Sequence, residues 1–98
     1  MNISSPSHNF YHILIPQIRH ILLKHWDPIG IGHLEFMQDE YDGYIPRIIE
    51  MLSAPNSHPH DIQDYLHYVE IDYMNLHPNL NKIHLTAEAL WKLSHPIE

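Results

Sequence analysis

Apolar residues recur three or four positions apart in four separate stretches of this chain, and this spacing is what most restricts its fold. Such spacing places the apolar side chains on one face of a helix. No stretch alternates apolar and polar residues over any length, and no Asn-Gly pair predicts a hairpin. The chain has 98 residues, a length that normally forms one core. We therefore predict a single all-α domain over residues 1–98, a compact four-helix fold with a loosely ordered lead-in at residues 1–8.

The first apolar stretch spans residues 9–26 and is interrupted by Pro16. A proline costs about 3 kcal/mol in a helix interior but is tolerated in the first turn. The helix therefore begins near Ile15, or it begins near Asn9 and is kinked; we favour a kinked or broken helix. The other three helices are expected near residues 45–52, 59–76 and 80–94.

A connection with all three glycines separates the first two helices, at residues 26–46. The residue before a proline avoids the helical region, so Asp27 should leave the first helix, and Gly30 gives the following turn its backbone freedom. Asp42 is placed to cap the second helix. The apolar residues of the connection are expected to lie against the core: Ile31, Leu34, Phe36 and Met37.

The charge balance favours a basic protein partner. Five Lys and Arg stand against twelve Asp and Glu, a formal charge of −7 with histidine neutral. This sign disfavours binding to phosphate backbones and favours steering of a basic protein. The alternative is that the charge only keeps the protein soluble. No stretch reaches the about 20 apolar residues of a membrane span, and the N-terminus has no secretory signal, so we expect a cytoplasmic protein with no membrane partner.

Metal binding and catalysis find little support in the sequence. His8 and His12 are four residues apart, and His58 and His60 form a second local pair, but no H-E-x-x-H motif is present. The absence of cysteine excludes disulfides, thiolate ligands and cysteine nucleophiles. No glycine-rich phosphate loop or G-x-S-x-G motif occurs. We therefore predict a protein that is not an enzyme and needs no metal, cofactor or small-molecule substrate.

Acidic and aromatic residues gather in two segments, which makes them the candidate contact surface. Tyrosine is enriched at the energetic centres of interfaces because its ring buries area while its hydroxyl stays satisfied. On the third helix, Tyr65 and Tyr73 fall on the apolar face and are expected in the core, whereas Glu70 falls on the polar face. The predicted partner-binding residues are Asp39, Glu40, Tyr41, Asp42, Asp64, Tyr68 and Asp72.

The run W-D-P-I-G at residues 26–30, followed by D-E-Y-D at residues 39–42 and by Tyr44, resembles a family of small uncharacterised bacterial helical proteins. The resemblance covers roughly residues 18–76, and the pair of motifs is more specific than either half. Some members are similar to immunity proteins of polymorphic toxin and contact-dependent growth inhibition systems. Because immunity proteins diverge with their toxins, shared residues should build the fold, which implies a structural role for Trp26, Asp27, Pro28 and Gly30.

The resemblance and the charge together predict an immunity protein, an antitoxin that binds a basic toxin effector domain and occludes its active site. An RNA-cleaving nuclease is the expected target, because its active site must be basic to hold phosphate. The alternative is a general helical interaction or regulatory module with an endogenous partner.

Overall fold

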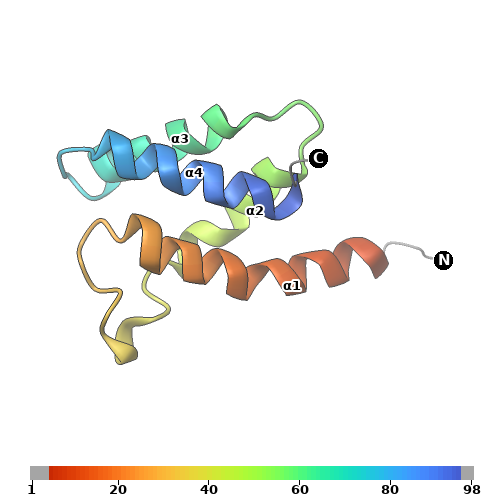
Figure 1. Ribbon diagram of the computed structural model, residues 1–98, viewed down its shortest axis with the longest axis horizontal. Helices are drawn as coiled ribbons and strands as arrows, with labels where there is room; N and C mark the ends of the chain where they lie inside the picture. The colour runs from red at the N-terminus through yellow and green to blue at the C-terminus, as the bar shows by residue number, and fades with distance from the viewer. Residues whose placement is uncertain (1–4, 96–98) are drawn as a thin grey trace.

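The computed structural model describes residues 5–95, with side chains from residue 12 onward. It confirms the all-α fold: four α-helices pack together, and the described residues form no strand. The helices are α1 (Ser5–Ile21), α2 (Ile45–Ser53), α3 (Pro59–Tyr68) and α4 (Leu80–Ser94). Helix α4 lies along α3 and also contacts α1, while α2 contacts all three other helices (Figure 1). The three later helices lie close to their predicted positions.

Helix α1 is not broken at the proline, and it starts earlier than predicted. It runs from Ser5 through Pro16 to Ile21 without a break. Proline has no N–H, so the carbonyl oxygen four residues before Pro16 lacks its usual helical donor. Because Pro16 is exposed to solvent, water can supply a hydrogen bond in its place. The predicted lead-in at residues 1–8 overlaps this helix, because residues 5–8 belong to α1; residues 1–4 lie outside the described part of the chain.

Helices α1 and α3 both end in a wider π-helical turn. These turns are η1 (Leu22–Trp26) and η4 (Val69–Tyr73). Each is closed by a hydrogen bond from a backbone N–H to the carbonyl oxygen five residues earlier. A π turn holds more residues than an α turn and so rotates the side chains that follow. This rotation explains one reversal: Glu70 is buried, with 2% of its surface exposed, whereas Tyr73 is 72% exposed. The predicted places of these two residues were wrong.

One core fills the space between the helices. Its best-covered members lie on all four helices, on η1 and in the connection between α1 and α2. Ile31 is buried, and Leu34 and Met37 pack against the core, as predicted for the connection. The largest side chains with almost no exposure are Trp26, Tyr41, Leu14, Ile18, Leu22, Ile48, Ile62, Leu66 and Leu90.

Asp27 organises the connection after η1 through its backbone and its carboxylate. Its backbone is left-handed, with φ of 37°, so the helix ends there. One carboxylate oxygen accepts hydrogen bonds from the Ile31 N–H (2.7 Å) and the Tyr41 hydroxyl (2.8 Å), and the other accepts one from the Gly32 N–H (3.0 Å). A side chain at Gly32 would collide with the carbonyl oxygen of Leu23. The loop therefore closes tightly over the end of η1.

Asn in place of Asp27 is expected to destabilise the protein in a pH-dependent way. Burial disfavours the Asp27 carboxylate, but hydrogen bonds from Gly32, Tyr41 and Ile31 outweigh it and lower its pKa. The stabilisation is then present above the unfolded pKa of about 3.9 and is lost as the pH falls through the folded pKa. We expect Asp27→Asn to lower the free energy of unfolding by about 1–3 kcal/mol at pH 7, measured by urea denaturation.

The same measurement at lower pH checks the sign. Below about pH 4 the difference between wild type and Asp27→Asn should shrink, because the native carboxylate becomes protonated as well. The exposed Asp39→Asn is the control and should change stability little at either pH. A constant loss from pH 7 to pH 3 would show that the charge on Asp27 is not what the loop depends on.

Candidate protein-interaction surface

An aromatic cluster leads from the core to the surface through Tyr44. The ring of Trp26 contacts Tyr41 and Tyr44, with centroids 5.2 and 5.7 Å apart. Tyr44 in turn meets Tyr65 of α3 and Tyr73 of η4 edge-to-face, at 6.5 and 6.3 Å. Aromatic pairs prefer such tilted and edge-to-face arrangements. Tyr44 therefore joins the connection between α1 and α2 to the far end of α3.

The acidic part of the connection lies beside this cluster. Burial raises the pKa of Tyr44, and the electrostatic effects of Tyr73 and Glu40 raise it further. Glu40 and Asp39 are both exposed. The two acidic segments found in the sequence are thus joined by tyrosines rather than lying on unrelated faces. We name this region the tyrosine surface; it comprises Glu40, Tyr44, Tyr65, Tyr68 and Tyr73.

Tyr41 is not available to a partner, which corrects its predicted role. Only 1% of its surface is exposed, and its hydroxyl both donates to Asp27 and accepts a bond from the Ile29 N–H (3.3 Å). Burial is the main cause that raises its pKa above the usual tyrosine value. Tyr41 therefore stabilises the connection from inside the core, in contact with Trp26 and Asp27.

Asp42 is half-buried and engaged with Arg19 of α1. The guanidinium donates to both carboxylate oxygens, with Nε–Oδ1 of 2.9 Å and Nη2–Oδ2 of 2.8 Å. This two-pronged hydrogen bond is the largest cause that raises the pKa of Arg19. Asp42 gives no side-chain cap to α2, so the predicted capping role is wrong. Its carboxylate fixes the connection to α1 and is poorly placed to bind a partner.

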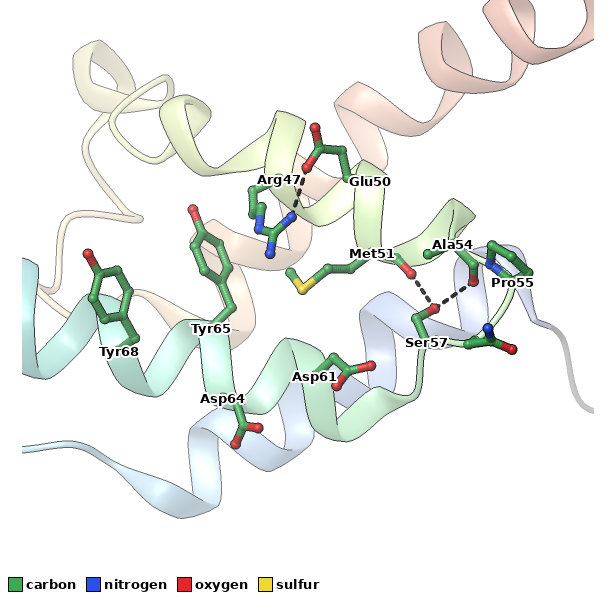
Figure 2. A pocket seen from close by; sticks show the side chains of 11 residues that line it. Arg47, Glu50, Met51, Ala54, Pro55, Ser57, Asp61, Asp64, Tyr65 and Tyr68 are labelled. Carbon is green, nitrogen blue, oxygen red and sulfur yellow. Dashed lines mark hydrogen bonds and ion pairs between the residues drawn. The ribbon is translucent and has the colours of Figure 1, made fainter.

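The three predicted contact residues beyond α2 are all exposed, and two of them line one groove. Asp64 and Tyr68 face an open groove of about 720 Å³ between α2 and α3, whereas Asp72 lies outside its lining (Figure 2). Tyr68 is 52% exposed and Asp64 carries an ion pair with His60 at 3.3 Å when that histidine is protonated. The groove residues from α2 and its C-cap were not predicted: Arg47, Glu50, Met51 and Ala54.

Phe36 is the most exposed large apolar side chain of the described residues, at 81%. It was expected against the core. It lies on η2 (Glu35–Met37), a 3₁₀ turn in the part of the connection that projects from the body (gold, lower left in Figure 1). Because Leu34 and Met37 already pack inward, the tight turn directs Phe36 outward. The amide of Gln38 donates to the Leu34 and Gly32 carbonyls (2.8 and 3.2 Å) and holds the turn in place.

The described residues were also compared with the geometry of metal sites and of membrane-spanning helices. Within residues 12–95, no group of three His, Asp or Glu side chains is arranged to hold a metal ion. The side chain of His8 lies outside the described residues. No helix of the described chain is both long and apolar enough to cross a bilayer.

Comparison with known proteins finds no counterpart: no family model, no curated protein and no solved structure matches this chain. The resemblance to small bacterial helical proteins therefore stays a prediction.

Chemical labelling of tyrosines should separate the surface from the core. Tetranitromethane reacts with accessible phenolates, so Tyr68 and Tyr73 should be nitrated first, while Tyr41 should stay protected in the native state by its burial and its raised pKa. Peptide mass spectrometry of partially nitrated protein at pH 8 measures the order. Urea-unfolded protein, in which all three should react at similar rates, is the control. Early modification of Tyr41 would contradict its burial in the core.

Proposed function

We propose that this protein is an immunity protein that binds a basic toxin effector domain, an RNA-cleaving nuclease, and occludes its active site. The observation that carries the proposal is the tyrosine surface, whose exposed rings belong to the segment that also carries the exposed carboxylates of Asp64 and Asp72. Tyr68 and Tyr73 are exposed, and Phe36 projects from the same connection that carries Asp39 and Glu40. Exposed aromatic anchors inside a charged rim are the usual composition of a protein-binding site.

The charges support a basic partner. Asp39, Glu40 and Asp72 are exposed carboxylates, and among the described residues no Lys, Arg or His forms an ion pair with any of them. A nuclease site must attract phosphate and therefore presents positive charge, so these carboxylates would both steer association and take the place of the substrate. The W-D-P-I-G and D-E-Y-D motifs suggest the class of partner, since they resemble a family of small bacterial helical proteins of which some are similar to immunity proteins.

The rigidity of the surface also favours tight binding. Hydrogen bonds of Asp27 and Gln38 and the Arg19–Asp42 ion pair hold the connection at three separate points of its sequence. A loop fixed before binding loses little conformational entropy when the complex forms. The exposed Phe36 can therefore act as an anchor without first having to be ordered.

The direct test is binding and protection with the effector domain of a toxin encoded beside this protein. We expect a complex detectable by calorimetry, weakened as salt rises from 50 to 300 mM, and rescue of cells that express the effector. No complex with the adjacent effector, or a complex that does not protect, would contradict the proposal and favour an endogenous partner instead.

Phe36→Ala should weaken this complex at least tenfold, a loss of about 1.4 kcal/mol. Because Phe36 is almost fully exposed, the melting temperature of the free protein should not fall. Leu85→Ala is the matched control: Leu85 is 53% exposed on α4, a helix that contributes no residue to the tyrosine surface, and its loss should change affinity less than twofold. Equal effects of the two substitutions would remove Phe36 from the interface.

A further inference from the structure

The groove between α2 and α3 has an apolar floor and an acidic rim. Met51, Tyr65 and Tyr68 follow one another along it, and Ala54 and Pro55 close its far end (Figure 2). Glu50 stands on the α2 side, and Asp61 and Asp64 stand on the α3 side. A volume of about 720 Å³ is enough for two or three side chains of a docked segment.

The carboxylates on the α3 side of the rim are not neutralised by a basic side chain of the rim. Its one cation, Arg47, donates to Glu50 at 2.9 Å and so leaves the α3 side unmatched. One carboxylate oxygen of Asp61, Oδ2, accepts a hydrogen bond from the His58 N–H (2.8 Å); the other oxygen takes no part in that bond. Asp64 is well exposed and meets only the imidazole of His60 among the described basic groups. A cation brought to the α3 rim would find carboxylates and tyrosine rings together.

We propose that this groove binds a short segment of the partner protein that places a bulky apolar side chain on the floor and an arginine against Asp61 and Asp64. The proposal rests on the proposed function, since it names the part of the basic partner that docks here. Arginine suits the site better than lysine, because its planar guanidinium pairs with carboxylates and stacks on aromatic rings. The chain's own Arg47 already pairs with one carboxylate of the groove, that of Glu50, at 2.9 Å.

Other occupants fit this chemistry less well. A second copy of the chain carries the same charge of −7 and would bring carboxylates to a carboxylate rim. A nucleic acid would be repelled for the same reason. An uncharged apolar molecule would cover the floor but would desolvate the rim without pairing it. Charge complementarity therefore selects a basic, partly apolar peptide segment.

Selection of displayed random 12-residue peptides on the full-length protein tests the proposal, with the peptides standing in for the docked segment of the partner. We expect enriched peptides to combine arginine with a large apolar residue within about one helical turn. Replacing that arginine by citrulline, which keeps its shape and loses its charge, should weaken binding at least tenfold by fluorescence anisotropy. No enrichment, or enriched peptides that bind equally with citrulline, would overturn the proposal.

Two tryptophan substitutions locate the bound peptide. Ala54→Trp fills the groove from an exposed position and should weaken peptide binding at least tenfold. Ser53→Trp, one residue earlier, is also exposed but does not line the groove, and should leave binding within twofold. Tyr68→Ala gives a second loss without adding bulk. Melting temperatures of all three variants show whether the fold is kept, and peptides that still bind Ala54→Trp and Tyr68→Ala would overturn the proposal.

Failure of this inference can be told apart from failure of the proposed function. If Ala54→Trp neutralises the adjacent effector as well as wild type does, and no peptide is selected, the groove is not a docking site but the immunity function stands. If selected peptides bind the groove while no effector is bound, the groove site stands and the immunity function fails.

Discussion

The hydrogen bond from the indole N–H of Trp26 to the carboxylate of Glu70 joins two helix ends that are 44 residues apart in sequence. Its length is 2.6 Å, and both side chains are buried. The other oxygen of Glu70 accepts from the N–H of Asn79, the residue that caps α4 (3.1 Å). A carboxylate left in a core without donors costs several kcal/mol. The ends of α1 and α3 and the start of α4 are therefore held at one point.

The interaction surface follows from this junction. The π turn that carries Glu70 into the core also turns Tyr73 outward. The ring of Trp26 contacts Tyr44, and Tyr44 in turn contacts Tyr73. The next residue, Asp27, shapes the connection that presents Phe36. Two neighbouring residues, Trp26 and Asp27, thus support the tyrosine surface and the turn that carries Phe36. Trp26 and Asp27 of the W-D-P-I-G motif position other side chains of the proposed surface.

Sequence periodicity was sufficient for the helices but not for the side chains at their ends. The three- and four-residue spacing located α2, α3 and α4, and the bounds of α4 are those predicted. The same spacing placed Glu70 outside and Tyr73 inside, because it assumes an α turn where the chain forms a π turn. Tyr41 was missed as a core residue because its partner Asp27 lies 14 residues away, and Phe36 because only the packing of Leu34 and Met37 directs it outward. Asp64 and Tyr68, on a regular α-helix, were placed on the surface correctly.

The central claim, that the Trp26–Glu70 bond holds the helix ends together, is tested most directly by a double-mutant cycle. Trp26→Phe removes the donor, Glu70→Leu removes the acceptor, and urea denaturation of both single variants and the double variant gives their coupling energy. The loss of the bond to Asn79 is common to both Glu70→Leu variants and cancels. A coupling of about 1.5–3 kcal/mol, typical of a buried hydrogen bond to a charged group, is the result that our account predicts. A coupling below about 0.5 kcal/mol, the limit for independent sites, would contradict it.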